Sequence, residues 1–549
     1  MANTPMVTYE TFAAAEEDAR AFRAQLERVA GRLGERHPFH INGVAQTGEG
    51  WIEERSPADS RVPIGEFASA TMDDFDRAVE AARRFAPEWA ATEWRERVRI
   101  VAGVSAKVTA RRHELAAILA YEIGKPLLEA LGEVDECVVL IDYYCAQMAA
   151  NEGFALEMGP AGGVATGGGG KGGGGGGGEG VAPPADGGTP GGEHVYSLLR
   201  PYGVWGVIGP FNFPMALLLG PIAAALIAGN TVVAKPSPHG YLSGLAVYEL
   251  FGEAGVPAGA LQMLNIPDER LGKRLYTHPG LDGLTFTGSH ATGMRVFHGF
   301  SREYPRPAIC EMGGKNPAIV TASADLRKAA VGVARSAFGF SGQRCSGCSR
   351  VLVAREVHDE LAELLEQRRR EVCVASPLDP ATQVGPVISR ASVERLLEAA
   401  RECGAEGWRV HGGGALTAGE LRFGNYAEPT VAEIPAADSR LLREELFTPF
   451  VALHPVGSLD EALELANGLV FGLTAGLYAE DSEEIERFRR TVKAGVIYVN
   501  REAGATTGAW PGIQSFGGWE GSGSTGRGAG GIHYLQQYMR EQSVTVVGS

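Results

Sequence analysis

Two cysteines, Cys345 and Cys348, stand three residues apart in the segment FGFSGQRCSGCSR. Such a pair can supply half of a zinc site, a redox-active dithiol, or a nucleophile beside an unrelated thiol. A structural zinc ion needs four ligands, and no second Cys-x-x-Cys is present, so we predict no metal. A long apolar helix is expected before the pair and a strand after it, unlike the turn that carries a thioredoxin-like dithiol. The pattern favours a nucleophilic Cys345 beside a small buried Cys348, but the spacing alone leaves the alternatives open.

Two further polar residues stand where they could work with a nucleophile. Glu311 begins EMGGKNPAIV, in which Gly-Gly and then a strand follow, so we expect its carboxylate at a turn before a strand. A solvated surface acid would give the same pattern. Asn212 interrupts the apolar run Val204–Ala228. Because a buried amide without a partner is costly, Asn212 either caps local structure or faces a site.

Two other segments carry weaker signals for an anionic ligand. In LTFTGSHATG (Leu284–Gly293) a predicted strand leads through Gly-Ser into a helix start, where free backbone N–H groups favour phosphate. The segment lacks the full Gly-x-Gly-x-x-Gly fingerprint. Lys235 closes the strand TVVAK, at the carboxyl end where α/β sheets bind ligands, although a solvated surface lysine is equally common there.

The elements that must position these residues alternate between short β-branched runs and helical periodicity. This alternation predicts parallel α/β sheets, and a second block from about 311 to 500 indicates two α/β domains in the 549 residues. The run Val204–Ala228 is long enough to cross a bilayer, but it contains three prolines. We therefore predict a strand at Val204–Ile208, a helix from about Pro214 to 229–230, and the strand TVVAK, with no membrane span.

Composition excludes several classes of partner and location. A net charge of −16 argues against nucleic acid or an anionic membrane surface. Seven cysteines in so long a chain are no secreted disulfide framework, and the N-terminus lacks the features of a signal or transit peptide. We therefore expect a reducing, cytoplasmic location. The glycine tract at 159–192 can form no core and is predicted to be a flexible or irregular loop without an assigned function.

From about residue 38 to the C-terminus, excepting the glycine tract, the chain resembles the aldehyde dehydrogenase superfamily. The matching segments, in family order, are PFNFP, GNTVVAKPS, TFTGS, EMGGKNPAIV, GQRCS, EELFTP, NGLVFGLTAGLY and SFGGWEGSG. The resemblance implies the aldehyde dehydrogenase fold, with a Rossmann-like NAD(P)-binding domain, an α/β catalytic domain and a small β oligomerisation arm. The implied boundaries are 1–37 for an N-terminal helical leader, 38–158 with 201–310 for the NAD(P)-binding domain, 159–200 with 525–549 for the loop and arm, and 311–524 for the catalytic domain. The C-terminal strand implies a homodimer or a multiple of dimers.

The same resemblance implies the roles of the residues singled out above. Cys345 attacks an aldehyde, the Asn212 amide and the Cys345 N–H hold the oxyanion, and Glu311 activates water to hydrolyse the thioester. The implied cofactor contacts are Lys235 and Ser237 at the adenosine ribose, Gly288, Ser289 and Gly293 at the pyrophosphate turn, Phe211 in a position usually held by Trp, and Glu445 at the nicotinamide ribose. Thr448 replaces the family's Gly, and Pro238 stands where many NAD-specific members have Glu. The cofactor expected is therefore NAD, with NADP left open.

Within the superfamily, AFGFSGQRCSGCSR resembles the L-glutamate γ-semialdehyde (1-pyrroline-5-carboxylate) dehydrogenases of proline catabolism. The implied reaction oxidises L-glutamate γ-semialdehyde to L-glutamate through a thiohemiacetal and a thioester. By this match, the N–H groups of Gly508 and Ala509 and the Ser346 hydroxyl hold the α-carboxylate, while Phe213 and Phe516 enclose the aliphatic chain. The segment before Thr507 is longer than expected, so a succinate- or aminoadipate-type semialdehyde is the alternative substrate. A non-catalytic relative is a further hypothesis, which the intact Cys345, Glu311 and Asn212 oppose.

Overall fold

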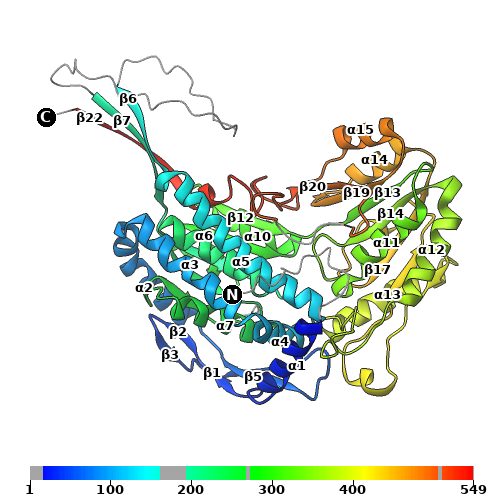
Figure 1. Ribbon diagram of the computed structural model, residues 1–549, viewed down its shortest axis with the longest axis horizontal. Coiled ribbons are helices and arrows are strands. Elements are labelled where there is room, and N and C mark those ends of the chain that lie inside the picture. Colours follow the sequence, from blue (N-terminus) through cyan, green and yellow to red (C-terminus); the bar gives the residue numbers. More distant parts are fainter. Residues whose placement is uncertain (1–15, 161–192, 268–271, 505–509, 548–549) are drawn as a thin grey trace.

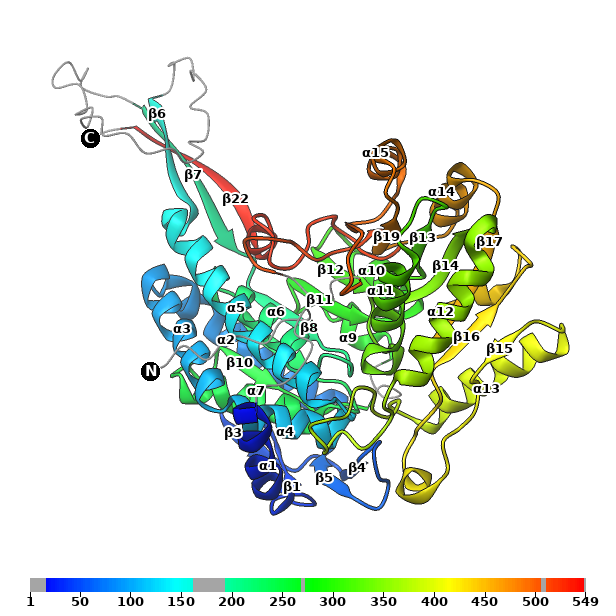
Figure 2. The same cartoon turned by 45° about the vertical axis from the view of Figure 1, so that its right-hand side comes forward.

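The computed structural model describes residues 16–160, 193–267, 272–504 and 510–547. These residues form two α/β units side by side and a three-stranded arm that projects away from the first unit (Figure 1). The second view shows the second unit forward, with its helices on both faces of its sheet (Figure 2).

The first unit is built on a seven-stranded sheet in the order β12-β11-β8-β9-β10-β2-β3. All neighbours from β12 to β10 are parallel, whereas β2 and β3 are antiparallel additions at one edge. The strands are β2 Phe39–Ile41, β3 Val44–Gln46, β8 Val204–Ile208, β9 Thr231–Lys235, β10 Leu261–Met263, β11 Gly283–Gly288 and β12 Ala308–Met312. The helices of this part of the chain are α1 Glu16–Ala30, α2 Met72–Ala91, α3 Trp94–Ala110, α4 Arg112–Ile123, α5 Leu127–Ala150, α6 Ala216–Ala228, α7 Tyr241–Glu253, α9 Arg274–Thr277 and α10 His290–Phe300.

The long apolar run is a strand–helix–strand unit, as the sequence predicted. β8 and β9 have the predicted bounds and pair in parallel. Between them α6 ends at Gly229, whose φ of 98° is the left-handed conformation that glycine adopts most easily. Helix α6 packs against α3 and α5 and is buried on nearly every side, which explains its uniformly apolar composition. Among the described residues, no helix combines the length and apolarity that crossing a bilayer would require.

The second unit is built on another seven-stranded sheet, in the order β15-β16-β17-β14-β13-β19-β20. Every neighbouring pair is parallel except β15 with β16. The strands are β13 Asn316–Val320, β14 Cys348–Ala354, β15 Val410–His411, β16 Thr430–Glu433, β17 Phe450–Val456, β19 Thr474–Tyr478 and β20 Val496–Val499. The helices are α11 Leu326–Phe338, α12 His358–Glu371, α13 Arg390–Ala405, α14 Leu459–Asn467 and α15 Ser482–Thr491.

Three smaller sheets complete the described chain. The arm consists of β6 Ala155–Pro160, β7 Glu193–Pro201 and β22 Met539–Val547, all antiparallel, with β7 in the middle (Figure 1). The other two sheets contain β1 Arg36–His37, β4 Trp51–Arg55 and β5 Pro63–Ala68 in one, and β18 Phe471–Gly472 and β21 Trp519–Glu520 in the other. The arm joins the end of the chain to the segment that follows α5.

The direction of the parallel strands brings the candidate residues together. In the first sheet, Asn212, Lys235, Ser289 and Glu311 all stand at or just beyond the carboxyl ends of strands, which meet at one edge. The chain then passes from β12 to β13 through three residues, so the amino ends of the second sheet's strands face this edge. Because β14 begins three residues after Cys345, the loop of residues 343–347 lies at the junction of the two sheets. We call it the nucleophile loop, after the role predicted for Cys345.

Candidate active site

A tight turn carries Cys345 to the start of β14. After α11, Phe340 and Ser341 adopt φ values of 46° and 55°, and Gly342 has a φ of 68°. A Cβ on Gly342 would lie 2.1 Å from the Thr448 carbonyl oxygen, so only glycine fits there. Non-glycine residues in this region cost about 1–3 kcal/mol each, so tertiary packing must hold the turn. Ser341 Oγ donates to the Gly385 carbonyl at 2.7 Å and Phe340 is fully buried, which supplies that packing.

Asn212 contacts the nucleophile loop directly. Its side-chain amide donates to the Gln343 carbonyl at 2.9 Å, and the residue is 4% exposed. The partner is far away in sequence, so the alternative of a purely local cap is wrong. An amide nitrogen carries two N–H groups, and the described residues provide an acceptor for one of them, so the second can donate to a ligand.

Glu311 lies in the last part of β12, not in the turn before a strand that the sequence suggested. Its backbone pairs with Thr287 on one side and bridges Gly523 on the other, which keeps it extended. The pKa of Glu311 is raised to about 8 because the carboxyl group is buried. A hydrogen bond from the Gly518 N–H lowers this pKa, but by less than burial raises it. Its Oε2 has no hydrogen-bond partner among the described residues. The carboxyl is therefore a group that can accept a proton near neutral pH.

The two cysteines of the opening pair differ in surroundings. Burial raises the pKa of Cys345 to about 12, the charges of Glu445 and Glu311 add to this, and a hydrogen bond from the Ser346 N–H opposes it. Cys345 is partly exposed, whereas Cys348 is 3% exposed and its Sγ lies 3.4 Å from the Arg350 carbonyl. All seven cysteines are unpaired. Cys348 is thus a packed residue, as predicted, and Cys345 is the accessible thiol of the two.

Several predicted cofactor residues lie along the carboxyl edge of the first sheet. Lys235 and Ser237 are buried at the end of β9, where Ser237 Oγ accepts from the His239 N–H at 3.3 Å. Ser289 caps α10 by accepting from the Thr292 N–H, so the first turn of this helix presents its N–H groups at the edge. A Cβ on Gly293 would lie 2.4 Å from Met312 Sδ, so glycine lets α10 pack closely on β12. Gly288, at the end of β11, has similarly little room because of the Phe286 ring.

Glu445 and Phe211 are brought to the same junction from opposite units. Glu445 Oε1 accepts from the Gly314 N–H at 3.1 Å, and a Cβ on Gly313 would lie 2.1 Å from Glu445 Oε2. Burial raises the pKa of Glu445 to about 7. Phe211 packs edge-on against Phe447, with ring centroids 5.9 Å apart. The loop that contains Glu445 and Phe447 in the second unit therefore packs against the segment that follows β8.

The predicted substrate contacts are described in part. Ser346 is fully buried and its Oγ has no hydrogen-bond partner among the described residues, so it can serve a bound ligand. Phe213 is 2% exposed and packs edge-on against Phe340. Phe516 is 9% exposed and bridges Ala529 through its backbone. Gly508 and Ala509 lie outside the described residues.

The structure adds residues that sequence reasoning missed. Lys125 and Glu133 form an ion pair in which both side chains are fully buried, and Lys125 Nζ lies 3.6 Å from the centre of the Phe213 ring. Glu133 Oε1 also accepts from the N–H groups of Met215 and Ala216 at the start of α6. The signal available was the charges inside the mainly apolar helical pattern GKPLLEALGEVDE. Two more missed residues, Asn316 and Thr474, hold the carbonyls of the nucleophile loop.

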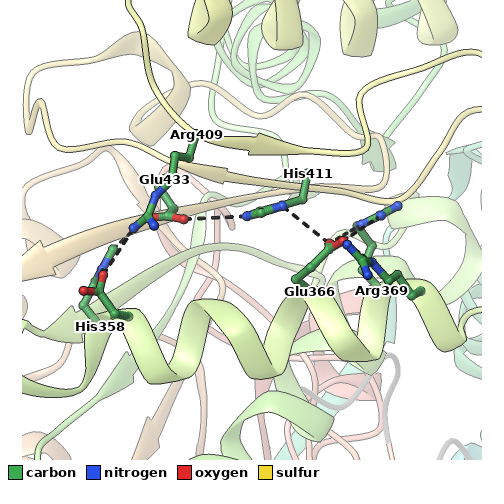
Figure 3. A network of polar contacts seen from close by, with 8 residues as sticks. His358, Glu366, Arg369, Arg409, His411 and Glu433 are labelled. Carbon is green, nitrogen blue, oxygen red and sulfur yellow. Dashed lines mark hydrogen bonds and ion pairs between the residues drawn. The ribbon is translucent and has the colours of Figure 1, made fainter.

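The cluster of possible metal ligands in the described ranges, at the start of α12 and on β16, contains no residue of the nucleophile loop. It consists of His358, Asp359 and Glu433. Arg409 already donates to both carboxylates, at 3.2 Å to Asp359 and 2.5 Å to Glu433. Figure 3 shows how this network continues through His411 to Glu366 and Arg369. A guanidinium thus balances the acids, and the cluster belongs to the edge of the second sheet.

The sequence and the fold that carry this site are similar to those of known proteins. The model of the aldehyde dehydrogenase family matches residues 44–544, which include the whole second sheet, every strand of the first sheet except β2, and all the residues of the site. The chain belongs to the aldehyde dehydrogenase family. The family's fold was predicted from the sequence, and this prediction is confirmed.

Relatives within the family are similar over nearly the whole chain. A 1-pyrroline-5-carboxylate dehydrogenase from Geobacillus thermodenitrificans is 32% identical over 96% of each chain. Among solved structures, a mutant of the Thermus thermophilus 1-pyrroline-5-carboxylate dehydrogenase is 31% identical, covers 100% of both chains and has a TM-score of 0.86. A Thermus enzyme of the same name, solved with bound NAD, is 32% identical with a TM-score of 0.86 over 100% of both chains. Several of the relatives that are similar over nearly the whole chain are thus 1-pyrroline-5-carboxylate dehydrogenases.

Proposed function

We propose that this aldehyde dehydrogenase oxidises L-glutamate γ-semialdehyde, which forms from 1-pyrroline-5-carboxylate, to L-glutamate with NAD. The observation that carries the proposal is the loop of Cys345 and Ser346, in which an accessible thiol stands beside a buried hydroxyl without a protein partner among the described residues. The near-full-length similarity to 1-pyrroline-5-carboxylate dehydrogenases supports the same substrate.

The chain's own residues account for the steps on sulfur. Cys345 Sγ attacks the aldehyde carbon, and the oxygen that becomes negative accepts hydrogen bonds from the Asn212 amide and the Cys345 N–H. Each such donor typically contributes a factor of about 10²–10³ in rate. Loss of the aldehyde hydrogen as hydride converts the thiohemiacetal to a thioester. Glu311 then takes a proton from water, which attacks the thioester carbon and releases the carboxylic acid and the thiol.

The residues at the sheet edge fit a dinucleotide. The first turn of α10 offers N–H groups to the pyrophosphate, Lys235 and Ser237 would hold the adenosine ribose, and Glu445 would hold the nicotinamide ribose. When bound, NAD accepts the hydride. Pro238 stands where an acid would repel a 2′-phosphate, so NADP is tested beside NAD.

The substrate end of the site is proposed from the same loop. Ser346 Oγ would donate to the α-carboxylate together with the N–H groups of Gly508 and Ala509, and the rings of Phe213 and Phe516 would enclose the methylene groups. The arm supports a homodimer or a multiple of it, because its outer strands expose Met158 at 62% and Val547 at 61%. The unpaired cysteines support a reducing compartment such as the cytoplasm.

The test is a panel of semialdehydes with the purified protein. Glutamate, succinate and aminoadipate semialdehydes are each supplied with NAD or NADP, and NAD(P)H formation is followed. We expect the highest kcat/KM with glutamate semialdehyde and NAD, and no turnover by Cys345→Ala. A preference for succinate semialdehyde, which lacks the α-amino-acid group, would refute the substrate. NAD(P)H formation by Cys345→Ala at the wild-type rate would refute the mechanism.

A further inference from the structure

Every carbonyl of the nucleophile loop, from Gln343 to Gly347, accepts a hydrogen bond. The donors, in order, are Asn212 Nδ2 at 2.9 Å, the Gly347 N–H at 3.0 Å, Asn316 Nδ2 at 2.7 Å, Thr474 Oγ1 at 3.1 Å and Asn316 Nδ2 again at 3.0 Å. Three of these five bonds come from the side chains of Asn316 and Thr474, which lie outside the loop. Hydrogen bonds to the carbonyl oxygens of the loop thus fix the orientation of its peptide groups.

Those two side chains begin neighbouring strands of the second sheet. Asn316 is the first residue of β13 and Thr474 the first of β19, and the two strands pair in parallel. Asn316 Oδ1 also accepts from the Thr474 N–H at 3.0 Å, so the two residues form one unit. Both are 2% exposed. Two buried, hydrogen-bonded residues at the edge of the second sheet therefore hold the loop in place.

The orientation of each carbonyl decides where an N–H points. In a trans peptide the C=O and the N–H point in opposite directions. Asn316 holds the Cys345 carbonyl, and the N–H of the same peptide is that of Ser346, which donates to Cys345 Sγ.

Thr474 acts through two peptides in succession. It holds the Ser346 carbonyl, whose peptide carries the Gly347 N–H that donates to the Arg344 carbonyl. The peptide of Arg344 in turn carries the Cys345 N–H. Within the described part of the chain, the Cys345 N–H donates to no acceptor. The Ser346 N–H therefore points to the sulfur of Cys345, and the Cys345 N–H is available for an oxygen of the ligand.

We propose that Asn316 and Thr474 are positioning residues, with Asn316 directing the Ser346 N–H to the thiolate and Thr474 directing the Cys345 N–H to the substrate oxygen. The proposal rests on the proposed function, in which Cys345 is the nucleophile. It assigns two separable effects to two buried side chains whose hydrogen bonds go to the loop and, for Asn316, to the Thr474 N–H. Loss of the Asn316 amide affects the ionisation of the thiol, whereas loss of the Thr474 hydroxyl affects the stabilisation of the oxyanion.

The Asn316 effect is measured on the thiol itself. Alkylation of Cys345 by iodoacetamide is followed against pH, with mass spectrometry to separate Cys345 from the six other cysteines. In Asn316→Ala the profile is expected to lie about 0.5–1 pH unit higher than in the wild type, because a charge-assisted hydrogen bond to the thiolate is lost. Thr474→Val should leave this profile unchanged.

The Thr474 effect is measured on turnover. Thr474→Val removes only the hydroxyl, since the backbone N–H to Asn316 remains, and kcat is expected to fall about 100-fold, as for loss of one oxyanion donor. Thr474→Ser should restore most of this loss, and the Kd of NAD should stay the same in both variants. Thr430→Val is the control, because Thr430 is also buried and begins β16 of the same sheet, and its Oγ1 donates to the Glu428 carbonyl and accepts from the Gly413 N–H. Its kcat should equal that of the wild type.

Two results would overturn the proposal: an Asn316→Ala alkylation profile that superimposes on the wild type, or a Thr474→Val kcat within twofold of the Thr430→Val control. The rate ratios are taken with whichever aldehyde the wild type oxidises fastest. A wrong substrate therefore leaves the comparison intact. A Cys345→Ala protein that still forms NADH refutes the proposed mechanism and, with it, the premise of the positioning roles, and this result is separate from the two above.

Discussion

The buried pair of Lys125 and Glu133 allows a prediction in which charge and packing can be separated. Both side chains are 0% exposed, and the carboxylate also accepts two N–H groups at the start of α6, at 2.8 and 3.1 Å. The ammonium lies against the ring of Phe213, one residue after Asn212. The pair thus supports the segment that contains Asn212, the proposed oxyanion donor.

Replacing Lys125 by Met keeps the length of the side chain and removes the charge. The Glu133 carboxylate is then buried without its cation, and breaking a buried pair in this way costs about 3–5 kcal/mol. Changing Glu133 to Gln as well removes the uncompensated charge, while the Gln oxygen still accepts from Met215 and Ala216. Replacing both charges is often close to neutral, so the double variant should recover more than half of the loss.

The measurement is urea unfolding of the wild type, the two single variants and the double variant, completed as a double-mutant cycle. Lys107→Met is the control, because Lys107 is 44% exposed and its distance to Glu253 is 3.9 Å. Such surface pairs contribute about 0–1 kcal/mol, so this variant should unfold almost as the wild type does. The kcat of Lys125→Met should fall as well, because Phe213 and Asn212 lose their support. A double variant as unstable as Lys125→Met would refute the reasoning, since the isolated charge could not then be the cause.

Three further predictions concern the acids around the site and the core. Because the pKa of Glu311 is about 8, kcat should rise with pH through an apparent pKa near that value, and the rise should vanish in Glu311→Gln; a flat wild-type profile would contradict its role as the base. Burial raises the pKa of Glu122 to about 8, so its stabilising contribution is complete below about pH 4.5 and is lost as pH rises through 8. Wild-type thermal midpoints should therefore fall between pH 6 and pH 9 more than those of Glu122→Gln, and equal falls would count against this assignment. Gly313→Ala places a Cβ against Glu445, so the Kd of NAD should rise about tenfold, whereas Gly252→Ala, with nothing within 4 Å of its new Cβ, should bind NAD normally.

Much of the fold was predictable because the sequence pattern is locally consistent. The strands Val204–Ile208 and Thr231–Lys235 were assigned with their bounds, since prolines and Gly229–Asn230 mark the ends of the helix between them. The resemblance of ordered motifs to the aldehyde dehydrogenases gave the fold and the family, both of which are confirmed.

What the sequence could not provide is which atoms meet across the two sheets. Asn212 was open between a local cap and a site, and only its hydrogen bond to Gln343 decides this. Glu311 was placed in a turn because Gly-Gly follows it, but backbone pairing on both sides keeps it in a strand. Nothing in the sequence distinguished Asn316 and Thr474 from the other residues of their motifs. Their contacts with each other and with the nucleophile loop depend on the register of β13 and β19. The domain boundaries and the roles of the individual site residues stay predictions.

The central claim, that Cys345 carries a glutamyl thioester which Glu311 hydrolyses, is tested most directly by trapping that intermediate. Glu311→Gln is mixed with glutamate semialdehyde and NAD, quenched in acid and analysed by peptide mass spectrometry. We predict a burst of about one NADH per subunit and a glutamyl adduct on Cys345, with no adduct in Cys345→Ala. A burst without an adduct on Cys345, or an acyl group of another mass, would contradict the claim.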